Sequence, residues 1–290
     1  MKKYNIIKII YMIKFFFIEL FNPNVIIING FFPRNMKFGN ANFGDDLNLH
    51  IIKKLSNNKY IIPYSYSVLS RFFKKTKYSC IGSVINYADK KTIVWGSGAI
   101  DDALDSKFDP KEILAVRGPM TRELLIRNGF SCPKIYGDPA LLTPLYYKPI
   151  HPIRYKLGII PHYIDKNSPL LDTYKDNLDV LIIDVQEYGK WTDFIDKVIS
   201  CGMILSSSLH GLIIADAYDV PNIWCKFSEN IRGNDFKFHD YFLSTGRNTH
   251  KPFKFDQIYK LDYICSLGDY WEKPNIDILK LLDSCPFVKK

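Results

Sequence analysis

The chain of 290 residues is long for one domain and comfortable for two. Hydrophobic residues make up 47% and charged residues 24%, which is the balance of a globular protein and excludes a disordered one. The formal net charge of +9 favours anionic partners such as phosphorylated small molecules or acidic lipid surfaces. We expect no nucleic-acid partner, because the lysines are scattered and no recognition motif accompanies them.

The cysteines indicate free thiols. Six occur, widely separated and without a CxxC pair: Cys80, Cys132, Cys201, Cys225, Cys265 and Cys285. Several lie in apolar runs, as buried free thiols do. A reducing cytoplasm is the simplest setting for such a chain. No cluster has the spacing of metal ligands, so we expect no metal site.

Residues 1–22 are basic and apolar. The basic start resembles a signal peptide, but no small-residue cleavage site follows it. Residues 9–18 are apolar except for Lys14, a run too short for a membrane span of about 20 residues. The charged residues point in more than one direction around a helix, so there is no clean amphipathic stripe. We expect a helix that either packs on the protein or lies at a membrane surface.

From residue 23 short apolar runs alternate with helical patterns. In residues 23–148 the expected strands are 25–28, 78–81, 92–95, 113–116 and 134–136. A helix at 44–55 has its apolar residues on one face, and another runs from Pro119, which suits a first turn, to Gly129. Strands alternating with helices predict a parallel sheet with helices on both faces.

The same alternation of strands and helices resumes after a linker at 149–152. In residues 149–290 the expected strands are 156–160, 179–183, 202–205 and 222–224, with a helix near 190–200 and a final helix at 274–283 that could return to the first domain. We therefore predict an α/β protein with two doubly wound, Rossmann-like domains that face a cleft. In such folds ligands gather at the carboxyl ends of the strands.

The stretch SSSLHG joins a strand to a helix. It consists of Ser206, Ser207, Ser208, Leu209, His210 and Gly211. Backbone N–H groups and the positive end of the helix dipole point outward at such a junction, which suits an anion. The hydroxyls add donors, and His210 adds a group that titrates near neutral pH. Alternatively, the serines only cap the helix.

Other polar residues also follow predicted strands. They are Asn42, Asp45, Asp46, Gly96, Ser97, Gly98, Arg117, Asp138 and His162. Asp45 or Asp46, at a helix start, could act as a general base or only as an N-cap. The planar guanidinium of Arg117 fits a carboxylate or phosphate through two parallel hydrogen bonds. The glycines after the third strand could serve only tight packing, and His162 could be structural.

Seven motifs follow one another in a characteristic order. They are NFGDDLN, VWGSG, AVRGPMT, YGDPALLTP, GIIPHY, SSSLHGLIIADAYDVP and KFHDY. In order and spacing they resemble the polysaccharide pyruvyl transferase family from about residue 24 to 245. The N-terminal extension at 1–22 lies outside the shared motifs. The region 226–240 is less clear, so Lys226 and Arg232 carry over weakly.

The resemblance implies a function. Such enzymes transfer the pyruvyl group of phosphoenolpyruvate to a sugar as a cyclic ketal and release phosphate, with no cofactor besides this co-substrate. The resemblance implies a GT-B-like pair of domains, with the acceptor on the first and the donor on the second. We expect the acceptor to be a hexose 4,6-diol of a lipid-linked repeat unit. We also expect a cytoplasmic enzyme, held at the inner face of the cytoplasmic membrane by residues 1–20.

The chemistry that the resemblance implies suggests roles for the candidate residues. Donor binding falls to Arg117 and the SSSLHG junction. His210 serves as the acid that protonates the methylene carbon, or stabilises the departing phosphate. Asp45 or Asp46 orients or deprotonates the acceptor. The expected acceptor side comprises Asn42, Asp45, Gly96, Ser97, Gly98, Asp138 and His162.

Two other functions remain open at this point. A GT-B glycosyltransferase would share the cleft and the basic helix terminus, but it needs a nucleoside pocket that the sequence does not reveal. A non-catalytic, membrane-surface subunit of polysaccharide assembly would have no use for polar groups that converge at strand ends.

Overall fold

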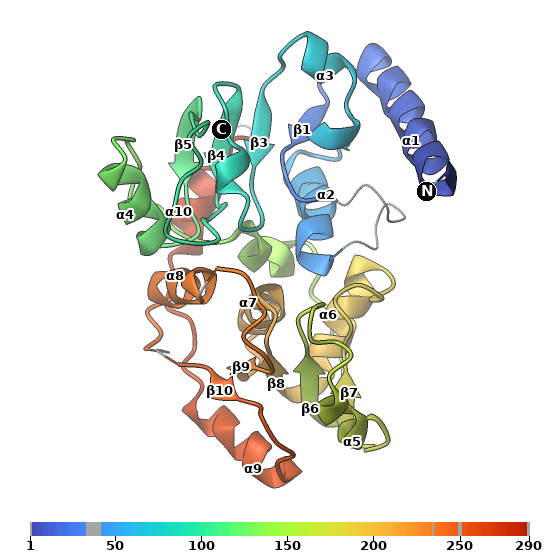
Figure 1. Cartoon of the computed structure of the whole chain (residues 1–290), viewed down its shortest axis with the longest axis vertical. Coiled ribbons are helices and arrows are strands. Elements are labelled where there is room, and N and C mark those ends of the chain that lie inside the picture. Colours follow the sequence, from blue (N-terminus) through green and yellow to red (C-terminus); the bar gives the residue numbers. More distant parts are fainter. Residues whose placement is uncertain (1, 33–41, 234, 249–250, 289–290) are drawn as a thin grey trace.

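The computed structural model describes residues 2–32, 42–233, 235–248 and 251–288 and contains two parallel sheets (Figure 1). The first sheet has the order β2-β1-β3-β4-β5 and comprises β1 (Ile26–Ile28), β2 (Ile61–Pro63), β3 (Lys77–Ser79), β4 (Thr92–Trp95) and β5 (Glu112–Ala115). The second has the order β10-β9-β8-β6-β7 and comprises β6 (Tyr155–Ile160), β7 (Val180–Ile182), β8 (Cys201–Ser206), β9 (Asn222–Lys226) and β10 (Phe253–Lys254).

The two sheets share one topology. Numbered from its own first strand, each has the order 2-1-3-4-5, and all its strand pairs are parallel. The order reverses between β1 and β3 in the first sheet and between β6 and β8 in the second. At such a point the loops leave the sheet in opposite directions and open a crevice at the carboxyl edge.

Ten helices surround the sheets in the described ranges. They are α1 (Lys2–Phe21), α2 (Phe43–Leu55), α3 (Leu69–Phe72), α4 (Pro119–Arg127), α5 (Asp172–Lys175), α6 (Trp191–Ile199), α7 (Leu209–Ala217), α8 (Phe236–Ser244), α9 (Leu261–Ser266) and α10 (Ile278–Asp283). Short 3₁₀ segments occupy 64–66, 85–87, 139–145, 169–171 and 267–270. Helix α2 begins where the Asn42 side chain accepts a hydrogen bond from the Gly44 N–H, and it has acidic residues in its first turn and lysines in its last.

Most expected elements are confirmed, and most of the exceptions are short. The strand expected at 134–136 is reduced to a single bridge between Tyr136 and Val116, because the chain turns at Gly137 with φ +132°. Strands β2 and β10 were not expected: the first ends at Pro63 and the second has only two residues. Helix α8, with nine residues, and the shorter helices α3, α5 and α9 were also not expected. All six cysteines are free thiols, as expected.

The end of the chain returns to the first half of the molecule (Figure 1). The indole N–H of Trp95, at the end of β4, donates to the carbonyl oxygen of Leu281 in α10 at 3.0 Å. The ring of Phe287 meets that of Tyr78 at a centroid distance of 4.7 Å. The final helix therefore covers the first sheet, although it follows the second sheet in the chain.

A buried ion pair joins the two halves of the chain, residues 23–148 with the first sheet and residues 149–290 with the second. The Arg117 Nε lies 3.0 Å from Asp240 Oδ2 of α8, and both side chains are fully buried. Asp240 also accepts hydrogen bonds from the backbone N–H and the hydroxyl of Thr121. A β-carbon at Gly118 would lie 1.9 Å from the Asp240 carbonyl oxygen, so only glycine allows α8 to approach this closely.

We expect Asp240→Asn to lower the free energy of unfolding by about 3–5 kcal/mol, because it leaves the buried Arg117 charge without its partner. Denaturant unfolding measures the change. The matched control is Asp102→Asn, which breaks the exposed pair with Arg127 and should cost less than about 1 kcal/mol. Equal effects of the two substitutions would show that the buried pair does not hold the halves together.

Candidate functional site

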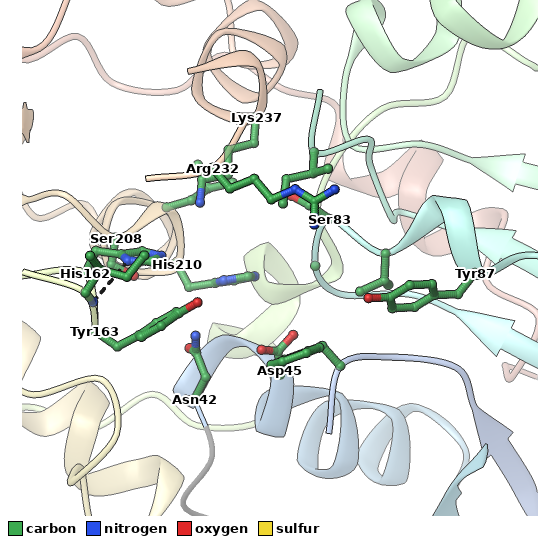
Figure 2. Close-up of a pocket in the computed structure, with 16 residues that line it drawn as sticks. Asn42, Asp45, Ser83, Tyr87, His162, Tyr163, Ser208, His210, Arg232 and Lys237 are labelled. Carbon is green, nitrogen blue, oxygen red and sulfur yellow. Dashed lines mark hydrogen bonds between the residues drawn. The ribbon is translucent and has the colours of Figure 1, made fainter. Parts of the chain in front are cut away.

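A cavity of about 320 Å³ lies between the two halves (Figure 2). The first half contributes Phe31, Asn42, Asp45, Gly82, Ser83, Val84, Tyr87 and Ile100 to its lining. The second half contributes His162, Tyr163, Ile164, Ser208, Leu209, His210, Arg232 and Lys237.

The topology of the sheets explains where this cavity lies. Phe31 follows β1 and residues 82–84 follow β3, the two strands between which the first sheet reverses its order. Residues 162–164 follow β6 and residues 208–210 follow β8, the corresponding strands of the second sheet. The crevices of the two sheets therefore face each other and form one pocket.

Asp45 supplies a carboxyl group that titrates close to neutral pH. Burial raises its pKa to about 7. The side chains of His210 and Lys237 partly oppose this shift, whereas the carboxylates of Asp46 and Asp138 add to it. A carboxyl group with such a pKa is suited to accept a proton at neutral pH.

Asp46, the neighbouring carboxylate, points elsewhere. It is buried and accepts a hydrogen bond from the Tyr188 hydroxyl of the second half at 2.6 Å. At the same end of α2, the ring of Phe43 stacks on the ring of Phe194 from the second half, with a centroid distance of 3.8 Å. The structure thus separates the two acids: Asp45 faces the pocket, and Asp46 joins the halves.

Two cations of the second half stand opposite Asp45 across the pocket, Arg232 and Lys237 (Figure 2). Burial and the nearby Arg117 charge lower the pKa of Lys237 to about 8, although Asp45 counteracts the shift. The ammonium group is therefore largely protonated at pH 7. The pocket has an acidic side from one half and a basic side from the other.

The His210 ring crosses from the second half onto the start of α2. A β-carbon at Gly44 would lie 2.0 Å from its Nδ1, so only glycine leaves room for the ring. Its Nε2 lies 3.7 Å from Oδ2 of Asp138, a side chain without exposed surface. In the described part of the chain neither atom has a hydrogen-bond partner. Asp138 therefore stands behind His210, on the side away from solvent.

His162 enters the pocket as a neutral side chain. Burial lowers its pKa to about 3, and the positive charge of Lys237 acts in the same direction. Its backbone N–H donates to the hydroxyl of Ser207 at 2.8 Å, which ties the loop after β6 to the loop after β8. At neutral pH this imidazole can donate or accept a hydrogen bond to a ligand, but it does not carry an extra proton that it could transfer.

The structure divides the expected site residues into two groups. Six line the cavity: Asn42, Asp45, His162, Ser208, Leu209 and His210. The others lie behind its wall: Asp46, Gly96, Ser97, Gly98, Arg117, Asp138, Ser206, Ser207 and Gly211.

The buried residues have evident partners. The Ser206 hydroxyl binds the backbone of Ile160 and Ser208, and that of Ser97 donates to the carbonyl oxygen of Gly82. The Arg117 guanidinium is enclosed by Asp240 and two further acceptors. Ser208 is the N-cap residue of α7, but its side chain makes no capping bond and faces the pocket.

Sequence reasoning missed several residues of the pocket. Lys237 opens the motif KFHDY, but nothing in that motif distinguishes its role, and Arg232 lies in the region where the resemblance is weak. Ser83, Tyr87 and Tyr163 follow strands, yet neither type nor spacing distinguished them. In the ranges that the structure covers, no group of three or more His, Cys, Asp or Glu residues could hold a metal ion. None of the helices described is long and apolar enough to cross a membrane.

Comparison with known proteins identifies the family of this two-sheet protein. The polysaccharide pyruvyl transferase family model matches residues 2–228, so it includes the N-terminal extension and stops before KFHDY. The chain is 31% identical over 220 residues to the succinoglycan biosynthesis protein ExoV of Rhizobium meliloti (strain 1021), covering 73% of this chain and 64% of ExoV. It therefore belongs to the polysaccharide pyruvyl transferase family.

A second relative is viral. The uncharacterized protein L143 of Acanthamoeba polyphaga mimivirus is 30% identical over 246 residues, which cover 82% of each chain. No solved structure matches the chain significantly.

The raised pKa of Asp45 predicts a pH-dependent stability. Between its ordinary pKa near 4 and the folded value near 7, the folded protein holds a proton that the unfolded chain releases, so stability falls as pH rises. Asp45→Asn removes this effect. We expect its melting temperature to approach that of the wild type near pH 4 and to exceed it increasingly up to pH 8.

Melting curves across this pH range measure the difference. Asp102→Asn, at an exposed carboxyl, is the control and should show no such trend. Parallel pH profiles for Asp45→Asn and the wild type would contradict the raised pKa.

Proposed function

We propose that the protein transfers the pyruvyl group of phosphoenolpyruvate to a hexose 4,6-diol, forming a cyclic ketal and releasing phosphate. One observation carries the proposal: a carboxyl group with a pKa near 7 faces two cations across a single pocket. A trianionic donor and a neutral diol require these opposite chemistries side by side. Family membership supports the same reaction class.

The second half is the proposed donor side. Arg232 and Lys237 supply positive charge, and Ser208 lies at the N-terminus of α7, where unpaired N–H groups and the helix dipole attract an anion. Arg117 does not touch the donor directly in this proposal. Instead it holds α8, the helix that presents Lys237, through Asp240.

The first half is the proposed acceptor side. Asp45 accepts a proton from a sugar hydroxyl, and Asn42 and neutral His162 bind the sugar through hydrogen bonds. His210, between the two sides, protonates the methylene carbon of the donor or stabilises the departing phosphate. One hydroxyl attacks the cationic carbon, phosphate leaves, and the second hydroxyl closes the ring.

The proposed reaction is balanced in protons and in charge. The diol loses two protons: one equivalent appears on the new methyl group and the other on the hydrogen phosphate. The trianionic donor thereby yields a monoanionic ketal and a dianionic phosphate. This chemistry needs no cofactor beyond the co-substrate. We include in the proposal a GT-B-like relation of the two halves and an acceptor carried on a lipid at the cytoplasmic membrane face.

The direct test measures phosphate release from phosphoenolpyruvate with a panel of lipid-linked oligosaccharides, followed by mass analysis of the product. Lys237→Ala should raise the KM for phosphoenolpyruvate about 10–100-fold, because it removes a charged contact of about 1.5–3 kcal/mol. Lys254→Ala, at an exposed lysine of β10, is the control and should leave KM unchanged. Sugar transfer from a nucleotide sugar, without phosphate release, would overturn the proposal.

Asp138 is proposed as a positioning residue that acts through His210. His210→Ala should lower kcat about 10²–10⁴-fold in a folded protein. Asp138→Asn should lower kcat less, leave the KM for phosphoenolpyruvate nearly constant and shift the His210-dependent limb of the pH–rate profile. If Asp138→Asn only lowers the melting temperature and keeps the wild-type pH profile, its role is structural.

A further inference from the structure

The outer face of α1 is an apolar stripe. Ile6, Ile10, Ile13, Phe17, Leu20 and Phe21 are all more than half exposed. Their spacing of three or four residues places them on one side of the helix. A helix on the surface of a water-soluble protein normally shows the reverse pattern, with its polar face outward.

The protein holds this stripe outward through the opposite face of the same helix. Glu19 is buried and accepts hydrogen bonds from the hydroxyls of Ser67 and Ser70 at 2.7 and 2.6 Å. The Phe15 ring, also buried, packs edge-on against Tyr66. Rotating the helix to hide the stripe would break these contacts, so the apolar face is a fixed feature of the fold.

A second exposed apolar group lies beside α1. The contacts of Glu19 connect α1 to α3, which Figure 1 shows next to the C-terminal end of α1. At the end of α3, Phe72 is 78% exposed and Phe73 is 72% exposed. Arg71 and Lys74, also exposed, flank these two rings directly in the chain. Residues far apart in sequence thus build one surface of apolar and aromatic groups with basic neighbours.

We propose that α1 and the end of α3 form one docking surface for an anionic lipid bilayer. Apolar side chains that enter the acyl boundary, with cations at the level of the headgroups, match such a surface in shape and charge. Val68 and α1 also line an open, apolar hollow of about 410 Å³ on this surface, which we assign to an acyl chain. A symmetric pair of this chain would instead pack two copies of a surface flanked by Arg71 and Lys74 against each other, with no acidic partner for these charges on the same surface.

This inference goes beyond the proposed reaction, since it concerns where the protein binds and not what it catalyses. Deleting α1 is unsuitable as a test, because Phe15 and Glu19 also support the fold. The test therefore uses two double variants of exposed residues, Ile10→Ser/Phe17→Ser on α1 and Phe72→Ser/Phe73→Ser on α3. Leu178→Ser, at a residue that is 92% exposed in the second half, is the matched control.

Co-sedimentation with vesicles measures binding, using phosphatidylcholine alone or mixed with phosphatidylglycerol. We expect the wild type and Leu178→Ser to bind the mixed vesicles, less tightly at high salt, and to bind the neutral vesicles weakly. Each double variant should lose at least tenfold in partitioning while keeping its melting temperature. Absence of wild-type binding, equal binding to both vesicle types, or unchanged binding of the α3 variant would overturn the proposal. So would dimerisation without lipid that both double variants abolish.

Discussion

The Arg117–Asp240 ion pair is the contact on which the site depends. It joins the first sheet to α8 with both charges removed from water, an arrangement that is stable only when each charge keeps its partner. Lys237 stands one turn before Asp240 on the same helix, so the pair also determines where the ammonium group enters the pocket. Arg117, which the sequence suggested as a ligand contact, therefore acts by positioning another cation, Lys237.

The pocket divides its chemistry between the two halves. Asp45, which lines the pocket, and Asp138, which lies behind its wall, come from the first, and Lys237 and Arg232 come from the second. Burial disfavours the charged forms of both Asp45 and Lys237 and moves their pKa values toward each other, to about 7 and about 8. Two groups that exchange protons near neutral pH therefore face one cavity, because the packing of the two halves buries both of them.

Several individual elements show how far the sequence could predict the structure. Strand β4 and helices α2 and α4 agree with expectation almost residue by residue, because apolar periodicity, capping and Pro119 are local signals. Strand β10 could not be predicted, because two residues are too few to show the alternating pattern of a strand. The SSSLHG junction was located correctly, but which of its hydroxyls faces the pocket depends on hydrogen bonds to Ile160 of β6 and to His162 just after it, some 45 residues earlier in the chain.

The sequence by itself determined the two-sheet α/β class, the family and the positions after strands at which polar groups gather. These follow from local patterns and from the rule that ligands lie at the carboxyl ends of parallel strands. Only the tertiary structure decided that Asp45 and not Asp46 faces the pocket, that Arg117 is enclosed, and that α1 turns its apolar side outward. The partners that decide these points lie far away in the chain, as Arg117 and Asp240 do at 123 residues apart, and a local pattern contains no information about them.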